Sequence, residues 1–131
     1  MAGLGTAAFA QLTTHHLTHV FNPAVPDDPA VRYFSFGAAL EPSRPPPLLS
    51  PLRLPYRVVS AAEGPNDGLV SVSSSQWGEY QGTLLGVSHL DLINWNNRLR
   101  SSLRGLVGIK PSFNAVAFYL AITDMLAKEG L

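Results

Sequence analysis

Prolines set the strongest limit on what this chain can fold into. Of its eleven prolines, nine lie between residues 23 and 55. Pro23, Pro26 and Pro29 should stop any helix that enters this stretch, because proline lacks an N–H donor and clashes with the preceding turn. Residues 41–55 hold six prolines and predict an extended excursion. Regular structure is therefore expected as short segments joined by long connections.

The remaining segments predict one helix followed by three strands. Residues 4–20 show a weak helical periodicity that should end at the first proline-containing stretch. Strands are expected at 31–40, where both alternating sets of side chains are largely apolar, at 56–61, and at roughly 83–87. Residues 69–84 leave two interpretations open: a strand by alternation, or a loop that enters one serine-capped helical turn.

Two helices are expected to complete the chain. The first has a mixed pattern over 91–108, and the second is strongly predicted over 114–130. Ser112 can cap the second helix and Gly130 can stop it. Its expected inner face comprises Val116, Tyr119, Leu120, Thr123, Leu126 and Ala127.

The order helix, strand, strand, strand, helix, helix indicates a single α/β domain with a mostly parallel sheet flanked by helices. A length of 131 residues fits one domain. In parallel sheets, working residues occupy loops at the C-terminal ends of strands. Asp67 and His89 both follow strand-like stretches, so both are expected in such loops.

Composition excludes several classes of partner. Nine basic residues balance nine acidic ones, so no net field attracts nucleic acid. No apolar run approaches the roughly 18 residues of a membrane span. The first twelve residues lack a basic region and a long apolar stretch, which predicts neither signal peptide nor anchor and favours an intracellular location. No disulfide is possible without cysteine, and no cofactor is predicted.

Asp67 and His89 form a candidate acid–base pair. A histidine acts as a base near neutral pH when an acceptor at Nδ1 fixes its tautomer, and a half-buried aspartate supplies that acceptor. In α/β-hydrolases the acid precedes the histidine in the chain, as it does here. The residues alone also allow a plainer interpretation, in which Asn66-Asp67-Gly68 is a common turn and His89 a structural residue.

The stretch EGPNDGLVSVSSSQWGEYQGTLLGVSHLDLINW resembles the segment that carries the last two triad members in bacterial family I triacylglycerol lipases and, more closely, in their fungal relatives. The resemblance extends over roughly residues 11–131. It implies an α/β-hydrolase fold, an acylglycerol or other ester lipid as substrate, Asp67 as the triad acid and His89 as the base. The chain then resembles the C-terminal half of such a lipase, so residues 1–131 are expected to form a partial domain.

The resemblance also suggests testing the sequence for a calcium site. The bacterial lipases hold calcium with the aspartate of an HLD motif, which is Asp91 here, and with a second aspartate that has no counterpart between Asp28 and Asp67. Calcium takes six to eight oxygen ligands, several of them carboxylates. The residues therefore do not predict a calcium site, and Asp91 is expected to cap the helix after His89.

The nucleophile is absent from this sequence. No G-x-S-x-G motif occurs, and the serines at 71 and 73–75 follow the acid and lack flanking glycines. We expect the nucleophile and the oxyanion hole N-terminal to Met1, on a lipase half that could be a partner of this chain. An inactive lipase remnant or interaction module is the alternative.

Other candidates are weaker. His15 and His19 have zinc-ligand spacing, but His16 stands where a metalloprotease motif needs glutamate, so a polar helix face is expected. Three aromatic residues could line an acyl pocket, although packing is the expected role; they are Trp77, Tyr80 and Trp95. The proline-rich stretch could bind an SH3-type domain but is expected to be a surface loop.

Overall fold

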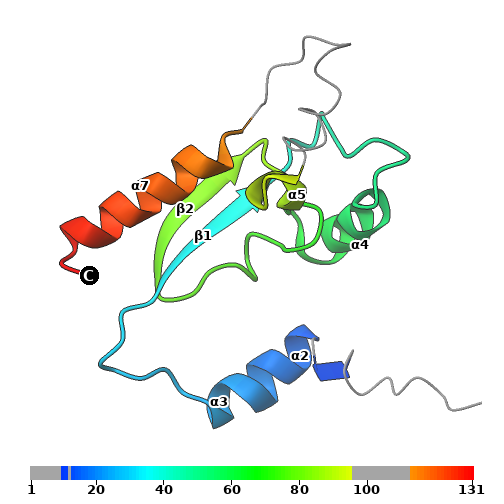
Figure 1. Cartoon of the computed structure of the whole chain (residues 1–131). Helices are drawn as coiled ribbons and strands as arrows, with labels where there is room; N and C mark the ends of the chain where they lie inside the picture. The colour runs from blue at the N-terminus through cyan, green and yellow to red at the C-terminus, as the bar shows by residue number, and fades with distance from the viewer. Residues whose placement is uncertain (1–9, 12, 96–112) are drawn as a thin grey trace, which may run out of the picture. The chain divides into compact units, whose positions relative to one another are not determined.

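The computed structural model describes residues 10–11, 13–95 and 113–131. The chain divides into two compact units, Met1–Tyr33 and Phe34–Leu131. Figure 1 shows the helices of the first unit and the sheet, helices and connections of the second.

The first unit contains an uninterrupted helical run: α2 (Thr14–His16), the π-helical segment η1 (Leu17–Phe21) and α3 (Asn22–Ala24). The expected end before the first proline is therefore wrong. The wider turn explains the difference, because the N–H of Asn22 reaches back five residues to Leu17 O. Pro23 then stands in the first positions of α3, where a missing N–H costs little. The predicted residues 4–9 and 12 lie outside the described part.

The second unit contains a parallel pair of strands, β1 (Phe34–Ala39) and β2 (Glu79–Leu85). A parallel pair is consistent with the predicted α/β fold class, although β1 is shorter than 31–40 and β2 starts earlier than 83. The register shifts between Ser35 and Gly37, where β2 contains one extra residue. A Cβ at position 37 would collide with the hydroxyl of Tyr80, so only glycine allows this close approach.

The predicted strand at 56–61 is wrong, because these residues belong to helix α4 (Arg53–Glu63). Pro55 falls in the first helical turn, where N–H groups have no partner within the helix. The Ser-Ala-Ala-Glu run that follows favours helix over strand. The helix ends at Gly64, whose φ is +87°. The loop that carries Asp67 therefore leaves a helix rather than a strand.

Residues 69–78 contain no strand, and of the two interpretations left open the serine-capped turn is nearer to the structure: the Ser75 N–H donates to Ser71 O at 3.1 Å and the Ser74 N–H to Ser71 Oγ at 3.0 Å. They form bends and turns with one isolated antiparallel bridge, Asn66 to Ser71. The short helix α5 (His89–Leu92) begins soon after β2 ends. The remainder of the helix expected over 91–108 lies largely outside the described residues.

The C-terminal helix α7 (Ala115–Lys128) confirms the strongest helix prediction. Its cap is Asn114, whose side chain accepts from the Ala117 N–H at 3.1 Å; Ser112 lies outside the described residues. Gly130, at φ +80°, stops the helix as expected. The N–H groups of Gly130 and Leu131 donate to the carbonyls of residues 127 and 126, which closes the helix end.

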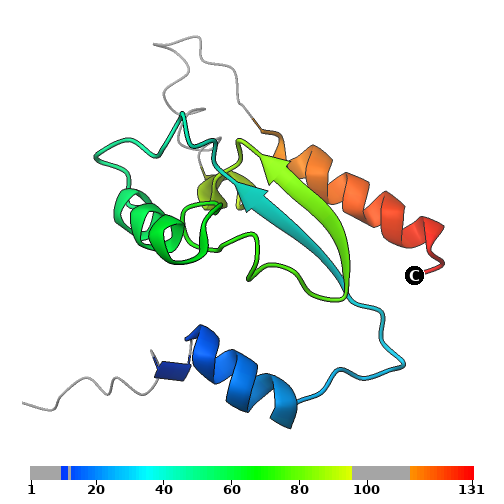
Figure 2. The same cartoon turned by 180° about the vertical axis from the view of Figure 1, so that it is seen from behind.

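The predicted inner face of α7 is wrong. Phe118 packs edge-on against Phe36 of β1 with ring centroids 5.3 Å apart, whereas Val116, Tyr119 and Leu120 are more than half exposed. Apolar side chains occupy most of the circumference of this helix, so periodicity alone cannot select its buried face. Figures 1 and 2 show α7 running along the sheet in both views.

The best-buried apolar residues are mostly small and surround a set of buried polar side chains. The apolar members are Ala38, Ala39, Leu52, Val87 and Ala115, and the polar ones are Asn66, Asp67, Ser71, Ser88 and Asp91. The first three of the polar residues follow α4, and the other two lie at the start of α5. Within the described residues, no helix combines the length and apolar composition that a membrane span requires.

Candidate active site

Asp67 lies in a tight reversal of the chain after α4. Its N–H donates to Val70 O at 3.1 Å, and the Val72 N–H donates to Pro65 O at 2.9 Å. Its Oδ1 accepts from the N–H groups of Leu69 and Val70 at 2.9 and 2.8 Å. The residue is 3% exposed. Two backbone donors thus hold the carboxylate through one oxygen and leave Oδ2 for another partner.

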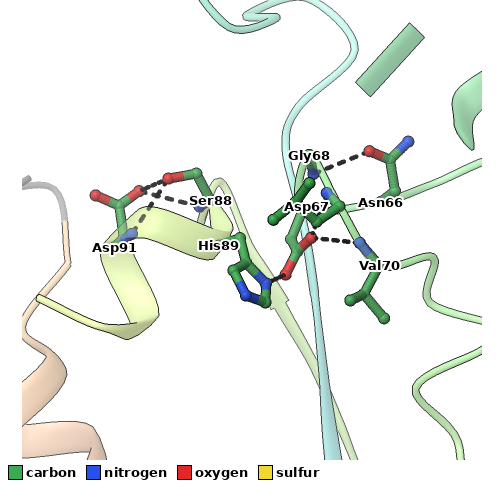
Figure 3. A network of polar contacts seen from close by, with 8 residues as sticks. Asn66, Asp67, Gly68, Val70, Ser88, His89 and Asp91 are labelled. Carbon is green, nitrogen blue, oxygen red and sulfur yellow. Dashed lines mark hydrogen bonds and ion pairs between the residues drawn. The ribbon is translucent and has the colours of Figure 1, made fainter. Parts of the chain in front are cut away.

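His89 supplies that partner. Its Nδ1 lies 2.8 Å from Asp67 Oδ2, and its N–H donates to Asp67 O at 2.9 Å (Figure 3). We assign the ring proton to Nδ1 because an ionised carboxylate only accepts hydrogen bonds. The neutral ring then carries its lone pair on Nε2. The His89 side chain is 35% exposed and that of Asp67 only 4%, so the pair has a buried acid and an accessible base.

The ends of the strands connect these two segments. The Leu40 N–H, directly after β1, donates to Asn66 O at 2.9 Å. The Gly86 N–H, directly after β2, donates to Ala39 O at 2.8 Å. The Asp67 loop and the His89 segment are therefore both attached to the C-terminal end of β1.

Asn66 has a larger role than the turn formation predicted for it. Its side chain is fully buried, and Nδ2 contacts Ser60 Oγ and Gly64 O, each at 3.0 Å, and Tyr56 O at 3.4 Å. Its Oδ1 accepts from the Gly68 N–H at 2.9 Å. The side chain therefore joins the inner face of α4 to the turn on both sides of Asp67. Asparagine is so common in turns that its presence in one does not predict burial.

Ser88 and Asp91 fix the start of α5. The Ser88 N–H and Oγ–H donate to Asp91 Oδ2 at 3.0 and 2.7 Å, and the Asp91 N–H faces Ser88 Oγ at 3.3 Å. This reciprocal capping box confirms the expected cap by Asp91, and the S-x-x-D spacing in the sequence could have identified Ser88 as its partner. His89 is the first residue of α5, so the cap also orients the candidate base.

The structure does not favour a calcium site at Asp91. One of its oxygens already accepts twice from Ser88. Across the described residues, no group of three or more histidine or acidic side chains could hold a metal ion. The donor set that calcium requires is therefore not assembled from these residues.

The other sequence candidates lie outside this arrangement. Trp77 precedes β2 and His89 follows it, so a strand of about 20 Å separates them and Trp77 does not line a pocket at the base. Trp77 and Trp95 are 46% and 56% exposed, contrary to the expected packing role. Tyr80 packs over Gly37, with its hydroxyl 2.6 Å from Thr83 Oγ1.

The histidine cluster forms part of an exposed polar helix surface, as expected. The rings of His15 and His19 stack with centroids 4.6 Å apart, and His19 Nδ1 lies 3.0 Å from His15 O. Stacked rings do not converge on one point, as metal ligands must.

Comparison with known proteins supports the resemblance drawn from the sequence. No family model matches the chain. The chain is 40% identical over 125 residues to Triacylglycerol lipase 2 of Saccharomyces cerevisiae. The match covers 93% of this chain and 37% of the relative, so the chain spans little more than a third of the length of the relative. The predicted resemblance to a fungal triacylglycerol lipase is confirmed over nearly the whole of this chain.

Proposed function

We propose that this chain carries the acid and the base of a serine-dependent carboxylic ester hydrolase that acts on triacylglycerols. Asp67 is the acid and His89 is the base. The observation that carries the proposal is the 2.8 Å contact between Asp67 Oδ2 and His89 Nδ1, combined with an accessible ring. The similarity to a triacylglycerol lipase supports the substrate class.

The proposed chemistry follows from the two sides of the His89 ring. Nε2 accepts the proton of the attacking serine hydroxyl, while Asp67 holds the tautomer and stabilises the imidazolium that forms. The imidazolium then gives this proton to the departing glycerol oxygen as the ester C–O bond breaks. Water is activated in the same way to release the fatty acid and restore the serine. His89 therefore returns to its neutral form in each half of the reaction.

The nucleophile must come from outside this sequence. No G-x-S-x-G motif is present, and Ser71, the first serine after the acid in the chain, is already engaged. Ser71 is 2% exposed, donates to the Glu63 carboxylate and lies 3.0 Å from Ser73 Oγ. We propose that a preceding part of the lipase supplies the serine and the oxyanion hole. Residues 1–131 would then be part of one α/β-hydrolase domain, with β1 and β2 within its larger parallel sheet.

A chimeric lipase tests the proposal directly. The matching segment of Triacylglycerol lipase 2 is replaced by this chain, and hydrolysis of a tributyrin emulsion is measured. We expect activity that falls by about 10⁴-fold in kcat with Asp67→Asn, because the histidine then adopts the wrong tautomer. His89→Ala removes the base and should reduce hydrolysis of the emulsion to the background rate.

The matched control is Asp124→Asn, which removes an exposed carboxylate that pairs with Lys128 on α7. It should leave kcat unchanged. A chimera that is active and insensitive to Asp67→Asn would reduce Asp67 to a turn residue. A folded chimera without activity would favour the inactive-remnant alternative.

A further inference from the structure

The loop that carries Asp67 has a returning arm, residues 69–72, that orients the acid. Leu69 and Val70 of this arm donate their N–H groups to Asp67 Oδ1 at 2.9 and 2.8 Å, and Figure 3 shows the second of these bonds. Oδ2 is thereby left to His89, whose Nδ1 lies 2.8 Å away. A displaced arm would let the carboxylate rotate, so the attachment of the arm matters for the acid.

Ser71 attaches the returning arm to helix α4. Its side chain is 2% exposed, and its hydroxyl donates to the carboxylate of Glu63, the last residue of α4. The same oxygen accepts from the Ser74 N–H at 3.0 Å and lies 3.0 Å from Ser73 Oγ. A hydroxyl has one proton and two acceptor positions. Because the proton of Ser71 goes to Glu63, Ser73 is the donor in the last contact, and the hydroxyl of Ser71 is fully used.

Glu63 occupies a position that the helix itself does not favour. A carboxylate is unfavourable at the C-terminal end of a helix, where the helix dipole is negative. The last turn of α4 also contains no basic residue. A hydroxyl that donates to an ionised carboxylate makes a stronger bond than one that donates to a neutral group. Glu63 is therefore better explained by its bond to Ser71 than by a stabilising effect on α4.

We propose that Ser71 and Glu63 are positioning residues for the candidate acid. Their bond holds the returning arm against α4, and the arm directs its two N–H donors to Asp67 Oδ1. Oδ2 then stays directed at His89. Both residues act through Asp67 and not on the reacting atoms. The inference deepens the proposed function and rests on it for the role of the acid.

The tautomer of His89 distinguishes this role from a merely structural one. A neutral imidazole that lacks a fixed acceptor at Nδ1 can carry its proton on either ring nitrogen. We therefore expect Ser71→Ala to convert part of the ring from the Nδ1–H to the Nε2–H form, measured by ¹H–¹⁵N correlation spectra of the folded 131-residue chain. In the chimeric lipase, Ser71→Ala should lower kcat about tenfold with KM unchanged, because a misplaced orienting group slows the reaction without weakening substrate binding.

The matched control is Ser75→Ala, which removes a hydroxyl from the same part of the chain. Ser75 Oγ donates to Val72 O at 2.8 Å, a bond between two neighbouring turns rather than to α4. Both variants should lower the urea midpoint, but only Ser71→Ala should change the tautomer and kcat. A native tautomer and native kcat in folded Ser71→Ala, or equal changes in both variants, would overturn the positioning role.

Variants of Glu63 test the same bond from its other side, because Ser71 is buried and its replacement could prevent folding. Glu63→Ala removes the acceptor at an exposed position and should reproduce the loss in kcat, whereas Glu63→Gln keeps an acceptor oxygen and should retain most of the native kcat. Glu63→Ala combined with Ser71→Ala should cost little more than either alone, since both remove one bond. Additive losses would contradict the proposal.

The tautomer also separates failure of this inference from failure of the proposed function. A native ring with its proton on Nε2 would overturn the acid–base pair and the positioning role together. A native ring with its proton on Nδ1 that neither Ser71→Ala nor Glu63→Ala disturbs would overturn the positioning role and leave the pair intact.

Discussion

Asp67 and His89 are joined twice, through their side chains at 2.8 Å and through their backbones at 2.9 Å. The backbone bond fixes the start of α5 against the Asp67 turn, and the side-chain bond then orients the ring. Two bonds between the same residues restrict both the position and the rotation of the imidazole. This restriction is what a base needs in order to receive a proton from one direction.

The tautomer of His89 is open to direct measurement in the 131-residue chain. We expect the proton on Nδ1, because Asp67 accepts there. Asp67→Asn should move it to Nε2, since an amide can donate to Nδ1. Long-range ¹H–¹⁵N correlation spectra at about pH 8.5, where an ordinary histidine is neutral, distinguish the two forms. An unchanged proton position in the variant would contradict the assigned contact.

Asn66 should be among the most sensitive positions for stability. Asn66→Ala leaves buried backbone groups around the turn without their partner, and we expect a loss of about 2–4 kcal/mol in the free energy of unfolding. Urea denaturation measures this loss. Asn114→Ala is the matched control, because it removes an exposed helix cap and should cost about 1 kcal/mol. Equal losses at both positions would show that burial of Asn66 adds nothing.

Two glycines with positive φ allow the cost of backbone strain to be distinguished from the cost of a side-chain collision. Gly64 and Gly68 have φ values of +87° and +109°, but a Cβ on Gly64 meets nothing within 4 Å, whereas one on Gly68 meets Leu52. Alanine at either position should cost about 1–3 kcal/mol in backbone strain. Gly68→Ala should cost about 1 kcal/mol more, because Leu52 must move. Identical urea midpoints for the two variants would contradict the Leu52 contact.

The 131-residue chain by itself should not hydrolyse esters. Its sequence contains no G-x-S-x-G motif, and Ser71 is committed to Glu63. Turnover of p-nitrophenyl butyrate by the purified chain should equal that of its His89→Ala variant. Turnover that the variant loses would mean that a serine of this chain serves as the nucleophile.

Sequence reasoning placed the candidate site better than it placed the elements around it. The aspartate and the histidine do meet, but the acid follows a helix rather than the predicted strand. Their proximity comes from bonds to the end of β1 that no local pattern encodes. Their catalytic roles stay a proposal.

The errors share one physical origin. Val58 and Val59 favour a strand locally, yet the bonds from Asn66 Nδ2 to Tyr56 O and Ser60 Oγ and the alanines that follow favour the helix α4. On α7, apolar residues occupy several faces, so the buried face is set by packing against Phe36, which is distant in sequence. The expected capping role of Asp91 is confirmed, whereas its partner Ser88, three residues earlier, was not predicted.

The irregular register beside Gly37 limits which substitutions the protein can tolerate during evolution. Gly37 lies at this register shift with the Tyr80 hydroxyl beside it, and Asp67 and His89 are each attached beyond that point. A slip of one residue would displace His89 by about 3.3 Å and turn the strand's side chains to the opposite face. Activity could then be lost by a substitution that leaves both Asp67 and His89 intact. A lineage that preserves this pair must therefore also preserve the small residue at position 37, which lies beside the Tyr80 hydroxyl.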